Sequence, residues 1–205
     1  MIMCARFGNT LTSEELSLYF SLPGVNPRLM PRPDIRPTNQ IPMILQQDDV
    51  RAVAEARWWL VPAWWKKDLK ELPSLFNARA EGLAEKPSFR SAFKARRCLI
   101  PATCFYEWSG TKGSKQKHCI SRADGAPLAF AGLWEEWRQP EGEPLRSCTI
   151  ITTTPNAVME PIHNRMPVIL GVEDWDEWLR PHPQPADLQH LLQPCPAEWL
   201  QARPA

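Results

Sequence analysis

Cys4 stands directly after Met3, a methionine that could itself start translation. If synthesis begins at Met3 and that residue is removed, Cys4 becomes N-terminal, and its thiol and α-amine form a free 1,2-aminothiol. A 1,2-aminothiol condenses with aldehydes, which an internal cysteine cannot do. The alternative is that Cys4 is a small buried hydrophobic residue at the start of a first strand. These few residues alone favour that alternative.

Glu107 lies inside CFYEW, an apolar strand in which a carboxylate is out of place. Burial disfavours the charged form of a carboxyl group, so a buried glutamate is a candidate proton donor or base near neutral pH. The alternative is a glutamate that faces solvent or is paired with an arginine. Because Phe105, Tyr106 and Trp108 surround Glu107, the two interpretations are equally favoured.

His163 lies in the turn EPIHNRMP, just before a predicted strand. An imidazole there can exchange protons near physiological pH, although a single loop histidine is more often merely exposed. Arg165, two residues further on, is a candidate either to hold a phosphate or simply to form a surface ion pair. Neither residue alone indicates a site.

The remaining polar candidates are unspecific one by one. Asn39 in RPTNQIP is flanked by prolines, and Asn is common in turns for purely local reasons. Asn77, Arg79 and Glu81 in FNARAE fit one turn of a solvated helix as well as they fit a site. Most of the ten tryptophans are expected in the core. A minority on the surface would provide stacking platforms for bases or sugars.

The composition is that of an ordinary soluble protein with one sizeable domain: 205 residues, 43% hydrophobic and 23% charged. A net charge of +1 excludes a broadly basic body, so contact with nucleic acid would need a local patch. The six cysteines form no CxxC pair, which argues against a zinc site and a dense disulfide framework. We find no leader and no apolar run near the roughly 20 residues of a membrane span. The expected location is therefore the cytoplasm.

Short elements must position these residues, because 22 prolines interrupt the chain. Thr12 and Glu15 form a capping-box pattern that predicts the start of a helix. Residues 88–98 predict an amphipathic helix with Phe89 and Phe93 inward and Arg97 outward.

Strand patterns dominate the middle of the chain. They are predicted at residues 43–47, 54–62, 98–108, 117–123, 127–137, 147–154 and 166–170. Two helices are predicted in the tail, at residues 173–180 and 185–193. Clustered strands with helices between and after them indicate an α+β fold. We expect a single domain over residues 1–205, built on a mixed or antiparallel, partly closed, barrel-like sheet with flanking helices.

In order along the chain, MCARF, RPTNQIP, WWLVPAWW, FNARAE, CLIPATCFYEW and HNRMPVIL resemble the motifs of the SRAP family. Members of this family are SOS response-associated peptidases, or abasic-site processing proteins. The resemblance covers about residues 4–170, followed by the predicted helices of residues 171–205. Any one motif would be weak, whereas six collinear motifs are a strong signal.

The resemblance implies a SRAP-like fold and a sensor of abasic sites in single-stranded DNA. Family members link an N-terminal cysteine to the ring-opened sugar as a thiazolidine, and they are also described as thiol autopeptidases that expose this cysteine. The implied catalytic residues are Cys4 as nucleophile, Asn39, Glu107 and His163. The implied DNA contacts are Arg79 and Arg165 to phosphates, Asn77 in the groove, and the aromatic residues Trp65 and Trp108.

The same resemblance implies no cofactor and no metal. The expected partner is single-stranded DNA containing abasic sites, with no membrane, and the protein is expected to act as a monomer. It would work in DNA repair and the SOS response, in the cytoplasm and at the nucleoid when bound to DNA.

Three features depart from the family pattern. Two residues precede Met3, so if translation starts at Met1 then Cys4 is internal and needs proteolysis. Ala5 replaces the glycine that usually follows the cysteine, which narrows backbone freedom. The chain stops at EWLQARPA, where the family usually continues, and this puts the C-terminal packing in doubt.

Two other functions stay open at this point. One is a peptidase acting in trans, with Cys4 as thiolate, His163 as base, and Asn39 or Glu107 as the group that orients it. The other is a non-catalytic module that binds single strands through its tryptophans and arginines.

Overall fold

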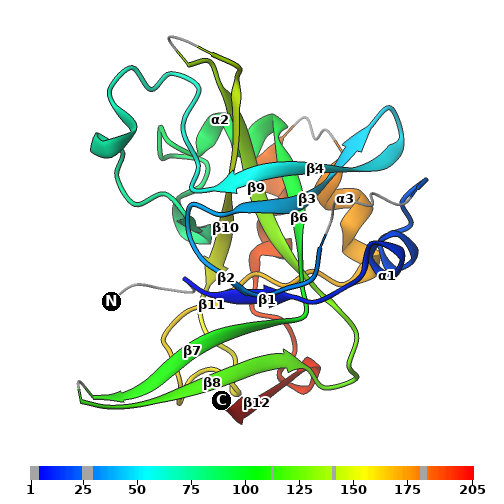
Figure 1. The fold of residues 1–205 in the computed structure, drawn as a ribbon, viewed down its shortest axis with the longest axis vertical. Helices are drawn as coiled ribbons and strands as arrows, with labels where there is room; N and C mark the ends of the chain where they lie inside the picture. Colours follow the sequence, from blue (N-terminus) through cyan, green and yellow to red (C-terminus); the bar gives the residue numbers. More distant parts are fainter. Residues whose placement is uncertain (1–4, 25–29, 112, 140–141, 181–183) are drawn as a thin grey trace.

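Two β-sheets form the framework of the protein in the computed structural model, which describes residues 5–24, 30–111, 113–139, 142–180 and 184–205 (Figure 1). The strands are β1 Phe7–Asn9, β2 Arg32–Ile35, β3 Gln40–Gln47, β4 Val50–Trp58, β5 Asn77–Arg79, β6 Arg97–Ala102, β7 Cys104–Thr111, β8 Ser114–Arg122, β9 Leu128–Trp137, β10 Leu145–Thr153, β11 Met166–Pro167 and β12 Leu200–Pro204. The α-helices are α1 Ser13–Tyr19, α2 Arg90–Ala95 and α3 Trp175–Leu179. The 3-10 helices are η1 Leu69–Glu71, η2 Ala80–Gly82, η3 Val172–Asp174, η4 Pro185–Leu192 and η5 Ala197–Trp199. The predicted α+β class is confirmed.

One sheet closes into a barrel. Its strands pair in the order β10–β4–β3–β6–β9, and β9 pairs again with β10. Alternate residues of each strand enter two different buried clusters, as the two-residue period of a strand requires. Ile100, Phe130 and Ile150 belong to the inner cluster, whereas Leu99 and Leu133 belong to an outer cluster that the helices cover.

The second sheet covers one end of this barrel. Its order is β12–β8–β7–β1–β2, and the long β7–β8 hairpin lies below the barrel in Figure 1. Phe7, Ile35, Phe105 and Ile120 point from this sheet into the inner cluster, and none of them is more than 1% exposed. The two sheets therefore share one core.

Some predicted elements are confirmed and others differ. The capping box at Thr12 and Glu15 is present, with both reciprocal hydrogen bonds. In the tail, the first predicted helix is α3, whereas the second is the 3-10 helix η4. β12 was not predicted, and it pairs with β8 along its whole length. The helical interpretation of FNARAE was wrong for residues 77–79, which form β5 and pair in parallel with β10, whereas Ala80 and Glu81 lie in the 3-10 helix η2.

Arg97 does not point outward as predicted, because α2 ends at Ala95 and Arg97 opens β6. Its side chain is buried and donates hydrogen bonds to the carbonyl oxygens of Phe93, Lys94, Trp178 and Arg180. These carbonyls lie at the C-terminal ends of α2 and α3, where a cation also meets the negative end of the helix dipole. Arg97 thus satisfies two helix ends from inside the protein.

Gly132 on β9 is needed for packing inside the barrel. A Cβ atom at this position would lie 2.9 Å from Sγ of Cys98, 2.9 Å from Cδ1 of Ile100 and 3.1 Å from the carbonyl oxygen of Thr149. We expect Gly132→Ala to lower the free energy of unfolding by about 1–3 kcal/mol, because an added methyl overpacks a dense core. Chemical denaturation measures this.

The matched control for this prediction is Gly24→Ala, since no atom of the described residues, apart from its chain neighbours, lies within 4 Å of a Cβ built there. We expect that change to stay within about 0.5 kcal/mol of the original stability. An equal loss in both variants would contradict the packing argument.

Candidate functional site

Several predicted site residues meet around the C-terminal end of β10. β5 runs beside β10 in parallel, with Asn77 opposite Ile150 and Arg79 opposite Thr152. On the same part of β10, β11 pairs in the antiparallel sense, and Pro167 is also opposite Thr152. The turn that carries His163 and Arg165 leads directly into β11. Residues that lie some 85 positions apart are thereby brought to one end of one strand.

His163 is buried, with 5% of its surface exposed, contrary to the usual exposed loop histidine. Its backbone N–H donates to the carbonyl of Met159 at 2.8 Å. Its ring Nδ1 lies 3.1 Å from the backbone nitrogen of Arg165 and 3.2 Å from the backbone oxygen of the same residue. Burial lowers the pKa of the imidazole, so the neutral ring predominates near pH 7.

The two contacts at Nδ1 serve the two neutral tautomers. When Nδ1 is unprotonated, it accepts from the Arg165 N–H and Nε2 carries the proton; when Nδ1 is protonated, it donates to the Arg165 carbonyl. Nε2 is buried and forms no hydrogen bond with any residue that the structure describes. The ring is thus held at one nitrogen, while the other remains available to give or take a proton.

Arg165 forms an ion pair instead of facing solvent, and only 12% of its side chain is exposed. Its Nη1 and Nη2 donate to the two carboxylate oxygens of Glu81 at 2.5 and 2.9 Å, and Nη2 also donates to the carbonyl of Thr152 at 2.6 Å. The hydrogen bonds from Arg165 are the main reason that the pKa of Glu81 is lowered. Arg165 therefore forms an ion pair in this structure, and its contact with a phosphate stays a prediction.

Arg79 is different, although it lies in the same FNARAE motif. Its side chain is exposed, and within the described ranges it forms no hydrogen bond or ion pair. A guanidinium with five free donors is suited to an anionic ligand such as phosphate.

Glu107 is buried at 4% exposure, on the face of β7 that points toward the inner core. Directly opposite it on β8 is His118, whose Nε2 lies 2.7 Å from Oγ of Ser109. Phe105, two residues before Glu107, shares the inner cluster with Met159, the residue that accepts the His163 N–H. Glu107 on β7 and His163 in the turn before β11 are therefore each close in sequence or bonded to a residue of the inner cluster.

Trp108 points to the opposite face of β7, because neighbouring residues of a strand alternate. The guanidinium of Arg6 lies 5.9 Å from the centre of the Trp108 ring and 6.0 Å from that of Tyr106, and Lys117 Nζ lies 4.0 Å from the Tyr106 ring centre. This outer face combines cations with aromatic rings, as surfaces that bind single strands do.

Asn39 shapes a turn between β2 and β3. Its side-chain oxygen accepts hydrogen bonds from the backbone N–H of Arg36 and from Nη2 of Arg32, both at 3.0 Å. The turn includes Thr38 in a left-handed conformation with φ of 79°. These contacts fit the local explanation for Asn39, and its catalytic role stays a prediction.

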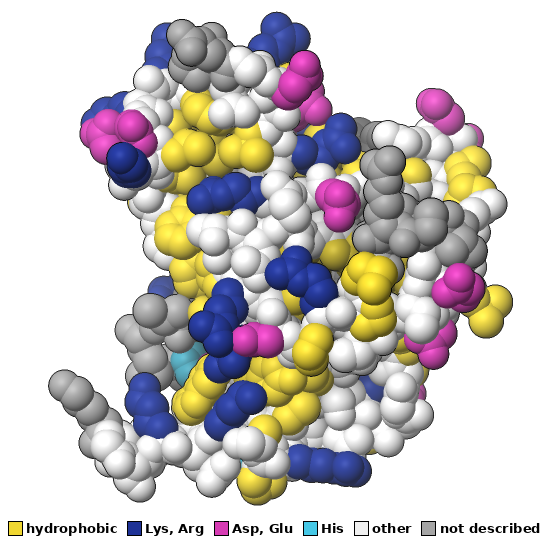
Figure 2. Space-filling view, viewed as in Figure 1, with side chains coloured by type: hydrophobic (Ala, Val, Ile, Leu, Met, Phe, Trp, Pro, Cys, Tyr) yellow, Lys and Arg dark blue, Asp and Glu magenta, His cyan; other side chains and the backbone are white. Residues whose placement is uncertain are grey.

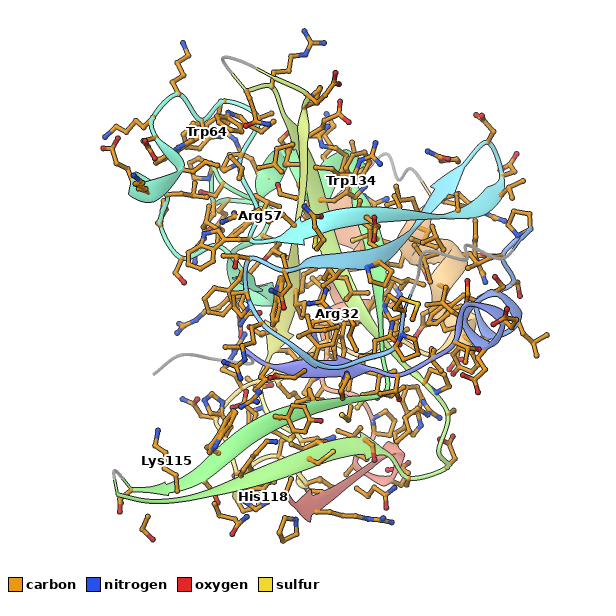
Figure 3. All side chains as sticks on the ribbon, in the orientation of Figure 1. Arg32, Arg57, Trp64, Lys115, His118 and Trp134 are labelled. Atoms are coloured by element: carbon orange, nitrogen blue, oxygen red, sulfur yellow. The ribbon has the colours of Figure 1, made fainter. Side chains whose placement is uncertain are left out.

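Trp65 lies far from the β7–β8 hairpin. It is half-buried, packs against the outer cluster and donates from Nε1 to the carbonyl of Asp68 at 3.3 Å. The exposed member of the pair is Trp64, with 52% of its surface exposed. Figure 3 places Trp64 at the top of the molecule and His118 at the bottom, so only an extended ligand would reach from one end to the other.

Lys and Arg side chains gather over the middle and lower left of the face in Figure 2. Figure 3 places Arg57 above Arg32 in the middle of this face, with Lys115 on the hairpin below. Arg57 is half-buried and pairs with no carboxylate of the described residues, and burial lowers its pKa. A net charge near zero is thus compatible with a local basic surface.

Cys4 lies outside the described residues, and the described chain begins at Ala5. Ala5 packs against the inner cluster, and the next residue, Arg6, accepts a hydrogen bond from the backbone N–H of Tyr106 on β7. The chain that follows Cys4 is therefore joined to the strand that carries Glu107.

Three partners in this region were not found from the sequence. Glu81 binds Arg165 from 84 positions away, and no local pattern indicates such a pair. Arg6 over Trp108 likewise depends on the pairing of β1 with β7. The position of His118 opposite Glu107 follows from the register of the β7–β8 hairpin. That register could have been predicted if the exact position of the turn between the two predicted strands had been known.

Within the described residues, no group of three or more His, Cys, Asp or Glu side chains is arranged to hold a metal ion. No helix formed by these residues has the length and apolar character needed to cross a membrane.

Comparisons with known proteins agree with the sequence motifs. The family model described as SOS response associated peptidase (SRAP) matches residues 3–205. The abasic site processing protein YoqW of Bacillus subtilis is 43% identical over 206 residues, which cover 98% of this chain and 91% of that protein. YoaM, an abasic site processing protein of the same organism, is 39% identical over 204 residues, covering 98% and 89%. A crystal structure of a protein from Bacteroides thetaiotaomicron superposes with a TM-score of 0.90 at 26% identity, covering 98% and 91%.

Proposed function

Because the chain belongs to the SOS response associated peptidase (SRAP) family, we propose that it processes abasic sites in single-stranded DNA by forming a covalent link through Cys4. The observation that carries this proposal is the pair of residues at the end of β10. The turn before β11 carries a buried histidine with Nε2 available, and β5, which pairs with the same part of β10, carries Arg79, which is free to bind an anion. A group that can carry protons and a cation for phosphate, both held at one end of one strand, are what chemistry on a DNA sugar needs.

The first step of the proposed reaction opens the sugar. An abasic deoxyribose is mostly a closed hemiacetal, and its aldehyde is released when the ring oxygen is protonated and the anomeric hydroxyl loses its proton. Glu107 is the proposed proton donor, because a buried carboxyl group can hold a proton near neutral pH.

The second step joins protein and DNA. The α-amine of an N-terminal Cys4, with an ordinary pKa of roughly 7.7–8.0, is partly neutral at pH 7 and attacks the aldehyde. His163 carries protons as the carbinolamine loses water to become an imine. The Cys4 thiol then adds to the imine carbon and closes a five-membered thiazolidine, which prevents β-elimination of the strand.

We further propose that the protein exposes Cys4 itself when residues precede it, since the family is described as peptidases. In this step the thiol of Cys4 is the nucleophile and His163 is the candidate base. We also propose that residues 1–205 act as one domain and as a monomer. The intact mass of the purified protein tells whether Cys4 is N-terminal.

The deciding experiment incubates the purified protein with a single-stranded oligonucleotide that contains one abasic site. We expect an adduct that survives heat and denaturant, with the mass of protein plus DNA minus one water. The matched control is the same oligonucleotide with a tetrahydrofuran residue, which has no aldehyde and should give no adduct. Turnover of peptides without an adduct would indicate a peptidase acting in trans, and reversible binding alone would indicate a non-catalytic module.

Arg79→Ala should weaken binding of single-stranded DNA and make it less dependent on salt. Each phosphate contact on a single strand contributes about 0.7 to the slope of log affinity against log salt, so one lost contact should lower the slope by about that amount. Binding measured at several salt concentrations checks this. Arg90→Ala, which removes an exposed arginine of α2, is the control, and an equal change in both variants would refute a specific role for Arg79.

A further inference from the structure

We propose that Glu81 is a positioning residue for His163, and that it acts through Arg165. This inference rests on the proposed function, in which His163 carries protons during adduct formation. Glu81 is the last residue of the motif FNARAE, but the family resemblance described above implies no role for it, and its role is argued from its contacts alone.

The contact between Glu81 and Arg165 is the strongest kind of side-chain pair. Both carboxylate oxygens accept hydrogen bonds, from Nη1 at 2.5 Å and from Nη2 at 2.9 Å. A bidentate pair of this type fixes the plane of the guanidinium as well as its position. Glu81 is about half exposed whereas Arg165 is 12% exposed, so the carboxylate closes over the outer side of a mostly buried cation.

Arg165 connects three segments of the chain. Its side chain reaches Glu81 in η2, which directly follows β5, and the carbonyl of Thr152 on β10. Its backbone belongs to the turn before β11. Glu81 therefore holds the turn from the side of β5, across the end of β10.

The backbone of the same arginine fixes His163. The Arg165 N–H and carbonyl are the two groups within hydrogen-bond reach of Nδ1, at 3.1 and 3.2 Å. A shift of this backbone would alter both contacts at once, and with them the nitrogen that carries the proton. Glu81 thus holds the Arg165 side chain, and through it the Arg165 backbone, which in turn contacts the His163 ring.

Arg79, which belongs to the same FNARAE motif as Glu81, does not take part in holding the turn of His163. It lies two residues before Glu81 and forms no hydrogen bond or ion pair with the residues described. Within the motif FNARAE, Arg79 is therefore available to bind a ligand, whereas Glu81 binds another residue of the protein.

The test compares Glu81→Gln and Glu81→Asp with the unchanged protein and with His163→Ala. Gln keeps the size but removes the charge and one acceptor, so we expect adduct formation on an abasic oligonucleotide to slow by about ten- to 10²-fold, as for a misplaced catalytic group. Asp, which keeps the carboxylate, should recover part of the rate. The double variant Glu81→Gln with His163→Ala should be no slower than His163→Ala alone, because both changes disable one unit.

Two further measurements separate this role from others. The salt dependence of binding to an undamaged single strand should keep its slope in Glu81→Gln, since no phosphate contact is lost. Glu136→Gln is the control. Glu136 forms an ion pair with Arg146 at 3.3 Å and is about as exposed as Glu81, so this change should leave the rate of adduct formation unchanged. Independent losses in the double variant, or a full rate in Glu81→Gln, would overturn the proposal.

A measurement without DNA tests the positioning role of Glu81 separately from the proposed function. The imidazole ¹⁵N chemical shifts of His163, assigned with His163→Ala, report which ring nitrogen holds the proton. We expect them to change in Glu81→Gln and to stay the same in Glu136→Gln. If the unchanged protein forms no adduct, the proposed function fails, yet these shifts still decide whether Glu81 positions His163. Unchanged shifts in Glu81→Gln would refute the positioning role.

Discussion

Cys4→Ala should abolish the covalent capture of abasic single-stranded DNA. The alanine variant keeps the α-amine and can still form an imine, but it has no thiol to close the thiazolidine. An imine without ring closure hydrolyses back or undergoes β-elimination, so no heat-stable adduct should remain on a denaturing gel. Reversible binding should stay nearly unchanged, because affinity for single strands comes chiefly from phosphate contacts and stacking.

The chain offers two matched controls for this variant. Cys104 and Cys119 are half-buried free cysteines on β7 and β8, in the same sheet as the start of the chain. Burial is the main cause that raises the pKa of Cys119, to about 11, which leaves little thiolate near neutral pH. Replacing either one with alanine should leave the adduct yield intact. A stable adduct of full yield in Cys4→Ala would end the thiazolidine proposal.

Glu107→Gln should slow adduct formation by about 10²–10⁴-fold, the usual contribution of general acid–base catalysis. Gln keeps the shape of the side chain and a hydrogen bond, but it cannot give a proton to the ring oxygen of the sugar. The finished adduct should have the normal mass and heat stability, because Glu107 is needed only to reach it. A time course of adduct formation measures the effect, using protein with an N-terminal Cys4.

Two histidine variants show whether the effect of Glu107→Gln belongs to the proposed mechanism. His163→Ala should also slow formation and should change the rate at which a finished adduct reverts, since reversal passes through the same imine steps. His118→Ala is the informative comparison, because His118 is directly opposite Glu107 on β8. Suppose that His118→Ala forms adduct as slowly as Glu107→Gln while His163→Ala forms it at the full rate. The residues that transfer protons would then be those of the β7–β8 hairpin, and His163 would not be among them. Normal rates in both Glu107→Gln and His163→Ala would leave both residues with structural roles.

The local features of this protein were predictable from its sequence. The helix start at Thr12 was correct, because a capping box is complete within four residues. Most strands of the barrel were anticipated from short apolar runs bounded by turn residues. The position of Cys4 after Met3 and the order of the six motifs are likewise properties of the chain itself, and the family match over residues 3–205 confirmed the family that the motifs indicated.

The structure decided what depends on contacts between distant residues. Arg97 is charged and was placed outward, but its site offers carbonyl oxygens from the ends of two helices, and these hold the cation inside. Trp64 and Trp65 are identical in type, and only the packing of Trp65 against the outer cluster decides which one is exposed.

In the candidate site, too, the sequence predicts the residue types, and the structure decides their contacts. The sequence supplied His163 and Glu107 as residue types that can move protons, whereas their burial depends on β7 and β11 packing on one core. The ion-pair partner of Arg165 could not be predicted from the sequence, because Glu81 lies 84 positions away. Local sequence fixes which groups are present and which short elements form, because those interactions span a few residues. The partner of a charge and the exposure of a ring are set only when the barrel closes, since closure brings the distant strands together.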